Sequence, residues 1–167
     1  KLPVTFYKDL EGMPEFTDYS MKNRTYRYME KEALYPFGYG LTYSDTCVTE
    51  AEVVGEVSAE SDIMLKATVK NNGTVDTDEV VQVYKDLDSP LAVRNYSLCG
   101  FKRVSLKAGE EKSVEFTISN KAMNIVDEDG NRYIAGKHFR LFAGVSQPDT
   151  RSAELTGHKP AEVEIAL

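Results

Sequence analysis

The sequence predicts an all-β fold, a sandwich of short antiparallel strands. Beyond residue 44, short runs alternate between apolar and polar side chains with a period of two, which is typical of half-buried strands. Turn residues separate these runs, and no segment shows the spacing of a convincing amphipathic helix. About seven such strands without helices favour a β-sandwich.

The first two strands are expected in residues 48–57 and 63–70. Gly55 interrupts the first run. In the second run the odd positions are Ile, Leu, Ala and Val, and the even positions are mostly polar, so one face is expected to be buried. Asn71, Asn72 and Gly73 supply the turn that follows.

The next strands are expected in residues 79–85, which are apolar on both faces, and in residues 101–106. A turn at residues 107–110 leads to an alternating run at 113–118.

Residues 127–131 form a hairpin-like turn around Gly130, since Asp, Asn and Gly favour turn conformations. An alternating run at 138–143 and a last one at 163–167 complete the expected sandwich.

Residues 1–44 have a different character and are expected to form a separate part from the sandwich of residues 45–167. They hold seven of the ten Tyr and three of the seven Phe, begin with a strand-like run at 2–7, and are otherwise punctuated by Pro and Gly as loops are. A free loop this aromatic would expose a large apolar patch. We therefore expect it to lie against a surface, part of which belongs to a domain of a longer parent chain.

Charge and hydropathy restrict the partners. Residues 1–44 carry six basic and six acidic side chains, whereas residues 45–167 carry 14 basic and 21 acidic ones, which is the whole net charge of −7. An acidic segment argues against nucleic acid, because phosphate binding needs clustered Lys and Arg. No apolar run approaches the length of a membrane span, so no membrane partner is expected.

The two cysteines and two histidines suggest no metal site. Cys47 and Cys99 form no Cys-x-x-Cys motif, so zinc is not expected. Two free buried thiols are the simpler expectation, and a disulfide is possible only if the two strands lie adjacent. His138 and His158 are 20 positions apart and fit no ligand spacing.

Other candidate motifs are weak. Asp127, Asp129 and Asn131 hint at a calcium loop, but Gly130 is misplaced for an EF-hand, and a tight turn is preferred. Glycosylation sequons at Asn23, Asn72 and Asn95 matter only in a eukaryotic secreted protein. We expect no catalytic residue, no cofactor and no metal in this chain.

Two segments carry a family resemblance. Residues 25–28 read Thr-Tyr-Arg-Tyr, and residues 34–43 read Leu-Tyr-Pro-Phe-Gly-Tyr-Gly-Leu-Thr-Tyr. They resemble the linker of glycoside hydrolase family 3, the β-glucosidases and β-xylosidases, which leads into a C-terminal fibronectin type III-like domain. Residues 79–84 and 98–104 resemble strands of that domain, with Cys99 in place of the usual Lys.

The resemblance also implies what lies outside this chain. The family's nucleophile is an Asp in a Ser-Asp-Trp context, whereas this chain has no Trp and Asp62 precedes Ile63. The general acid/base of most members lies upstream of Lys1. No catalytic residue can therefore be transferred to this sequence.

The resemblance implies a non-catalytic accessory domain that stabilises and positions the upstream catalytic domains of its parent chain, a retaining hydrolase of terminal β-linked sugars. A carbohydrate- or polymer-binding module, with polysaccharide as a partner, is the alternative. An independent enzyme is a third, disfavoured because the pair of carboxyl groups that a retaining hydrolase needs is missing. Secreted, periplasmic and cytoplasmic locations all remain open.

The aromatic run makes a specific structural prediction. In an extended chain its period of two would place five side chains on one side, packed on the sandwich: Tyr35, Phe37, Tyr39, Leu41 and Tyr43. Gly38 and Gly40, on the other side, would allow close backbone approach. Residues 45–167 are expected to fold alone, with proteolysis cutting first within residues 8–33.

Overall fold

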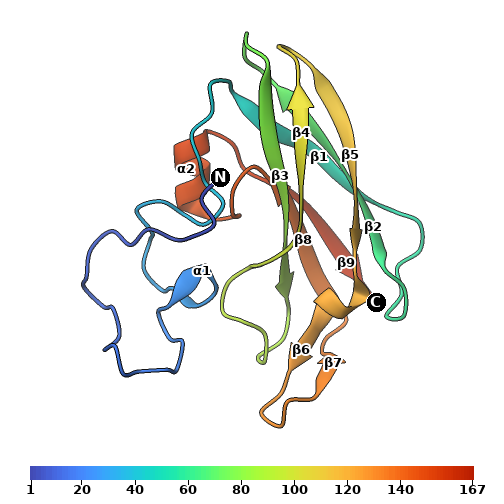
Figure 1. The fold of residues 1–167 in the computed structure, drawn as a ribbon. Coiled ribbons are helices and arrows are strands. Elements are labelled where there is room, and N and C mark those ends of the chain that lie inside the picture. The colour runs from blue at the N-terminus through green and yellow to red at the C-terminus, as the bar shows by residue number, and fades with distance from the viewer.

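The computed structural model describes all 167 residues, and its main body is two antiparallel sheets packed face to face (Figure 1). The first has the order β1-β2-β5, with bounds Thr46–Val54, Ile63–Asn71 and Glu111–Ile118. The second has the order β4-β3-β8-β9, with bounds Ser97–Leu106, Thr77–Leu87, His138–Gly144 and Ala161–Ala166. The predicted all-β sandwich is confirmed.

Alternation along the strands builds the core between the sheets. Every odd residue of β2 from Ile63 to Asn71 is buried, as the period of two predicts. Val81 and Val83 of β3 and Leu141 of β8 face these residues in a cluster of 16 buried apolar side chains. Burying each Val or Leu contributes about 1.5–3 kcal/mol, so this cluster is the main source of sandwich stability.

Two strands, β3 and β4, extend furthest beyond their predicted bounds. β3 extends from Thr77 to Leu87, and β4 begins at Ser97. The early part of β4 pairs with β3 on either side of a bulge near Val83. The shift of register at the bulge hides the simple alternation there, which is why the sequence pattern shows only residues 101–106.

Smaller elements lie at the ends of the sandwich. A 3₁₀ turn, Asn120–Met123, leads into the hairpin of β6, Asn124–Val126, and β7, Arg132–Ile134. The helix α2, Thr150–Thr156, was not predicted. The side chain of Asp149 caps it by accepting the N–H of Ser152 over 2.6 Å, and Gly157 ends it at a φ of 76°.

Residues 1–44 are irregular and contain one helical turn, α1, Thr25–Tyr28. The predicted strand at residues 2–7 is wrong, because only Phe6 forms a bridge, with Tyr35. This stretch pairs back on the linker: the N–H of Leu2 donates to Tyr39 O over 2.7 Å, and the N–H of Gly38 donates to Leu2 O over 2.8 Å. Figure 1 shows the whole segment on the side of the molecule that carries β3 and α2.

Candidate functional site

The outer face of β3 is covered by residues 25–44, here named the aromatic linker. Val81 and Val83 point into the core, so Gln82 and Tyr84 point outward, yet they are only 3% and 0% exposed. The side-chain amide of Gln82 donates to Gly38 O over 2.9 Å and to Val145 O over 3.1 Å. The hydroxyl of Tyr84 donates to Gln82 Oε1 over 2.6 Å, and burial raises the pKa of that hydroxyl.

Gly38 makes this close approach possible. A Cβ atom at Gly38 would lie 2.0 Å from Gln82 Oε1, and the residue has a φ of 78°. Both facts require glycine, since other residues avoid this backbone region and no side chain fits the space. The predicted close backbone approach is confirmed at Gly38.

Three aromatic rings form a further contact between the aromatic linker and β3. Tyr26 stacks on Phe37, with ring centroids 4.4 Å apart, and meets Tyr84 edge-on at 6.2 Å. The hydroxyl oxygen of Tyr26 also accepts the N–H of Leu98 over 3.0 Å. These offset and edge-to-face geometries are the favourable ones for aromatic pairs. The linker is therefore fixed to β3 and to the start of β4.

Asn95 holds α1 in place. Its side-chain amide donates to Tyr26 O and to Met29 O, each over 2.8 Å, and its backbone N–H donates to Arg27 O over 3.0 Å. Both side-chain protons are thus used within the fold, so this sequon residue serves as an anchor for the helical turn.

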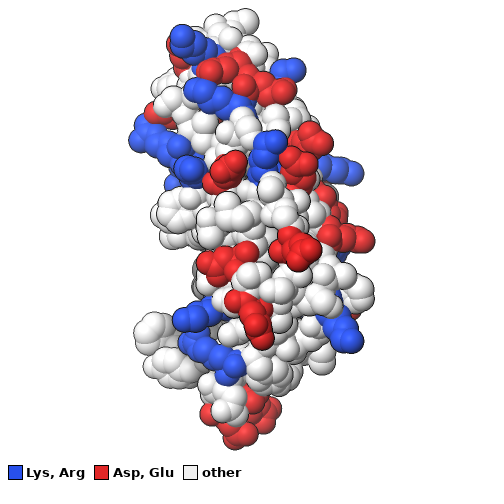
Figure 2. All heavy atoms as spheres, turned by 90° about the vertical axis from the view of Figure 1, so that its right-hand side faces the viewer, with Lys and Arg blue, Asp and Glu red and all other residues white.

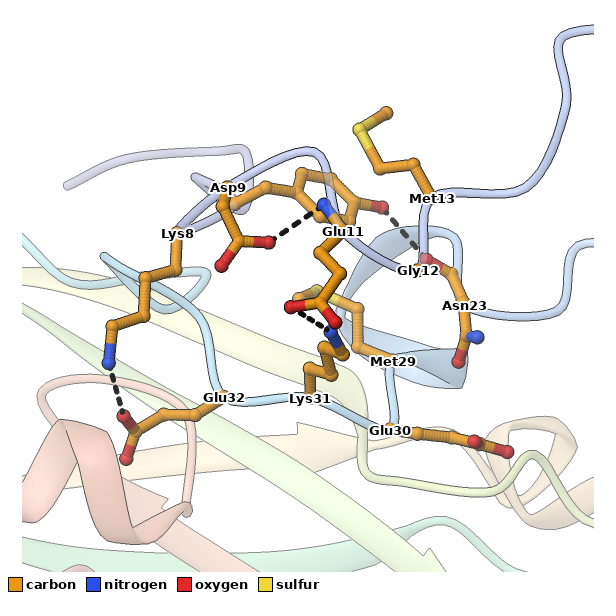
Figure 3. Close-up of a pocket in the computed structure, with 11 residues that line it drawn as sticks. Lys8, Asp9, Glu11, Gly12, Met13, Asn23, Met29, Glu30, Lys31 and Glu32 are labelled. Atoms are coloured by element: carbon orange, nitrogen blue, oxygen red, sulfur yellow. Dashed lines mark hydrogen bonds and ion pairs between the residues drawn. The ribbon is translucent and has the colours of Figure 1, made fainter.

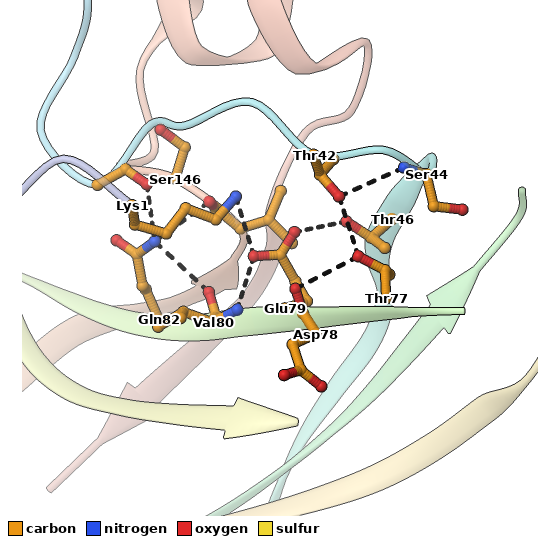
Figure 4. Close-up of polar contacts among 12 residues, drawn as sticks. Lys1, Thr42, Ser44, Thr46, Thr77, Asp78, Glu79, Val80, Gln82 and Ser146 are labelled. Atoms are coloured by element: carbon orange, nitrogen blue, oxygen red, sulfur yellow. Dashed lines mark hydrogen bonds and ion pairs between the residues drawn. The ribbon is translucent and has the colours of Figure 1, made fainter. Parts of the chain in front are cut away.

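A buried carboxylate anchors the first residue of the chain. Glu79 on β3 is 1% exposed and lies 2.9 Å from the ammonium of Lys1 (Figure 4). Its Oε1, which faces Lys1, accepts the N–H of Val80 over 2.6 Å, and its Oε2 accepts the hydroxyl of Thr46 over 2.6 Å. A buried charge is tolerable only when it is paired and hydrogen-bonded in this way.

The predicted packing of all five linker side chains is wrong in part. Phe37 and Tyr39 are half-buried, but Tyr35, Leu41 and Tyr43 are 40%, 93% and 96% exposed. The positive φ of Gly38 turns the chain out of the extended conformation, and Tyr39 N–H closes the turn on Pro36 O over 3.2 Å. The period of two therefore does not persist beyond the glycine.

Exposed apolar side chains gather in residues 1–44. This quarter of the chain holds eleven of the 18 large apolar residues that are exposed: Val4, Phe6, Leu10, Met13, Phe16, Tyr19, Met21, Leu34, Tyr35, Leu41 and Tyr43. Leu10, Phe16 and Tyr19 are 83–90% exposed. Exposed apolar side chains concentrated in one segment are a common feature of interaction surfaces.

A hollow of about 250 Å³ lies within the same segment (Figure 3). Its rim carries the ion pairs Lys31–Glu11, at 3.3 Å, and Lys8–Glu32, at 3.9 Å. Asn23 Oδ1 lies in its wall, buried and without a hydrogen-bond partner. All its lining residues belong to residues 7–32, so it is a feature of the exposed segment and not of the sandwich.

The remaining sequence candidates are turns and surface groups. Asp127 Oδ1 accepts the N–H groups of Asp129, over 3.0 Å, and Asn131, over 2.8 Å, which confirms the predicted tight turn. Hydrogen bonds from Asn131 hold the pKa of Asp127 below its usual value. His138 is exposed, and His158 Nε2 lies 2.6 Å from Asp45 Oδ1. No cluster of His, Cys, Asp and Glu in the structure could hold a metal ion.

The cysteines lie in different sheets and are both free. Cys47 is buried on β1, and Cys99 is half-buried on β4. Burial raises the pKa of the Cys99 thiol to about 12. The expectation of free thiols is confirmed.

Charge on the face of β2 and β5 is mixed. Figure 2 shows acidic and basic side chains interspersed there, without an extended basic patch. No helix of the structure is long and apolar enough to cross a membrane.

Glu79, Gln82 and Asn95 were not identified as anchors from the sequence. The sequence does contain a signal for Glu79 and Gln82, because both are polar residues in a strand that is otherwise apolar on both faces. A buried polar side chain needs a partner, and here the linker and Lys1 supply it.

Comparisons with known proteins agree with this architecture. A family model of the fibronectin type III-like domain matches residues 79–147. The chain is 38% identical over 163 residues to a xylan 1,4-beta-xylosidase of Xylanibacter ruminicola, covering 93% of this chain and 18% of the relative. It is 31% identical over 166 residues to a beta-xylosidase of Formosa agariphila, covering 93% and 23%.

A crystal structure of a GH3 beta-glucosidase from Bifidobacterium adolescentis shares the fold. It superposes with a TM-score of 0.78 at 24% identity, over 98% of this chain and 25% of that one. This chain thus spans about a fifth of the length of the relatives it matches. It carries a fibronectin type III-like domain, an accessory part, and corresponds to one segment of the β-xylosidases of glycoside hydrolase family 3 that it resembles.

Proposed function

We propose that this chain fixes the position of the catalytic domains in a parent glycosidase that removes terminal β-linked sugars with retention. The support is the match to β-xylosidases along nearly the whole chain, although the chain spans only about a fifth of each. The catalytic carboxylates would lie in the parent's other domains.

The chain divides into two parts in this proposal. Residues 45–167 are the sandwich, whose first strand begins at Thr46. Residues 1–44 combine the tail of the preceding domain with the aromatic linker. One side of this segment is tied to the sandwich through Gly38 and Phe37, and other side chains of the segment point into solvent.

One observation supports the proposed partner, which is the upstream catalytic domains of the same polypeptide. Apolar exposure is concentrated in residues 1–44, with Phe16 and Tyr19 at 90% and 85%. Such side chains gain about 25 cal/mol for each Å² that a partner covers. The upstream catalytic domains of the same polypeptide are the occupant we assign, because the relatives are four to five times longer than this chain.

Residues 1–44, docked on the sandwich on one side and on the catalytic domains on the other, would hold the catalytic domains in one orientation. Catalysis depends on the positions of reacting groups, and a misplacement of about 1 Å can lower the rate about a hundredfold. The accessory domain would act by restricting the relative motion of the catalytic domains, without contacting the sugar.

A polysaccharide-binding module is the less supported function. Flat saccharide binding needs a strip of exposed aromatic rings, and on the sandwich the exposed ones are Phe101 and Tyr133, on separate strands β4 and β7. Titration with xylan and cellulose oligosaccharides tests it, and saturable binding to the sandwich would favour it.

The test of the proposed function uses the parent chain. Phe16→Ser with Tyr19→Ser should lower kcat/KM for a nitrophenyl xyloside or glucoside at least about tenfold, because the domain interface loses its apolar contacts. The matched control is Val54→Ser with Val126→Ser, which also removes two exposed apolar side chains but outside residues 1–44. Equal activity in both variants would overturn the proposal, as would turnover of either substrate by residues 1–167 alone.

A further inference from the structure

A second hollow, of about 460 Å³, lies on the sandwich and is unrelated to the apolar surface of residues 1–44. Its walls come from α1, from the adjoining ends of β3 and β4 with the loop between them, and from the segment 121–132, which contains β6 and the start of β7. Figure 1 shows that loop between α1 and the β6–β7 hairpin. This hollow is named the cationic groove.

Its charged side chains are all basic. Arg27, Lys85, Lys121 and Arg132 line it, and no lining residue is an Asp or Glu. None of the four takes part in an ion pair, although ten of the chain's other basic groups do. In a chain of net charge −7, four unpaired cations around one hollow form a local positive field.

Lys85 is the most confined of the four. It is half-buried on β3, and its ammonium donates to the carbonyl oxygen of Ala122. Burial, followed by the charge of Arg27, lowers the pKa of Lys85. An ammonium has three protons to donate, and a buried cation is costly unless an anion or several acceptors compensate it. An anion in the groove would supply that compensation.

The rest of the lining is mostly apolar. Ten of the 17 lining residues are hydrophobic, among them Leu91, Val93, Leu98 and Ile125. The volume lies in the range of small-molecule sites, which combine an apolar lining with a few polar groups that fix orientation. A compact inorganic anion would leave this apolar surface unused, and a polyanion would not match it.

We propose that the cationic groove binds a small organic anion, a carboxylate attached to an apolar body. The carboxylate lies among Lys85, Lys121 and Arg132, where charge-assisted hydrogen bonds form, and the apolar body lies against Leu91 and Ile125. This assignment does not depend on the proposed positioning role, because the groove lies outside the exposed apolar surface.

The test uses 3-phenylpropanoate as the probe and its neutral amide as the matched control ligand, by calorimetry and by amide chemical shifts of residues 1–167. The carboxylate should bind saturably and at least tenfold more tightly than the amide, with shifts at Leu98 and Ile125. Lys121→Gln with Arg132→Gln should weaken binding about tenfold. Both side chains are exposed, so the fold should persist, and thermal melts check this.

Lys102→Gln with Lys137→Gln is the control variant, since it removes the same charge from exposed residues outside the groove. It should change the affinity less than twofold. The proposal is overturned by the absence of saturable binding, by equal affinity for the amide, or by equal weakening in both variants.

Discussion

The side-chain amide of Gln82 donates to the carbonyl oxygen of Gly38 across 44 positions of sequence, over 2.9 Å and out of contact with solvent. This bond joins the outer face of β3 to the turn of the aromatic linker. Its buried donor and acceptor must stay paired, because an unsatisfied buried polar group costs about 1–3 kcal/mol. It therefore specifies where the linker docks.

Gly38→Ala should destabilise the chain by about 2–4 kcal/mol, which combines the cost of a positive φ with displacement of Gln82. Gly55→Ala is the matched control. Gly55 has a φ of 87°, and nothing lies within 4 Å of its added Cβ, so only the backbone cost of about 1–2 kcal/mol applies. Denaturant unfolding measures both. Equal losses in the two variants would show that contact with Gln82 does not matter.

Phe37→Ala should cost roughly 2–3 kcal/mol. This is below the about 3–5 kcal/mol of a fully buried Phe, because the ring is half-buried in its stack on Tyr26. Tyr43→Ala, at a ring that is 96% exposed, should change stability by less than about 0.5 kcal/mol. If Phe37→Ala melts like the unsubstituted chain, the linker is not docked through this ring.

Glu79→Gln should destabilise the chain by about 2–4 kcal/mol, because it leaves the ammonium of Lys1 without its anion at a site that is nearly closed to solvent. Asp78→Asn is the neighbouring control. It removes an exposed pair with Arg103 and should have little effect. Urea titrations of both variants compare them, and a milder effect at Glu79 than at Asp78 would refute the anchoring role.

The thiols should be unreactive in the folded chain. Burial raises the pKa of Cys99 to about 12, so at pH 8 this group remains the thiol and not the nucleophilic thiolate, and Cys47 is buried. Iodoacetamide at pH 8 should label both residues only after unfolding in guanidinium. Rapid labelling of Cys99 in the native chain would contradict its partial burial against the core of the sandwich.

The sandwich could be predicted because the alternation that specifies each strand lies within a few consecutive residues. In β2 the odd positions from Ile63 to Val69 are apolar, and the pleat places them on one face whatever the partner strands are. The helix α2 was missed because seven residues are too few to show a 3.6-residue period. Its Asp149 cap and terminal Gly157 were visible in the sequence, but such pairs also occur in turns.

The docking of the linker and the cationic groove could be predicted less well. The aromatic run suggested contact with the sandwich, but the φ of Gly38 decides which rings reach it, and the alternation of residues does not encode that angle. The four cations of the groove come from four separate segments, which only the topology brings together.

Hydrogen exchange at the amides that donate from the sandwich side to the linker tests the docking most directly. Docking predicts slow exchange at Asn95 and Gln147, whose N–H groups donate to Arg27 O over 3.0 Å and to Phe37 O over 3.3 Å. Most amides of residues 8–22, where exposed side chains predominate, should exchange much faster. Exchange at Asn95 and Gln147 as fast as in residues 8–22 would contradict the docked arrangement.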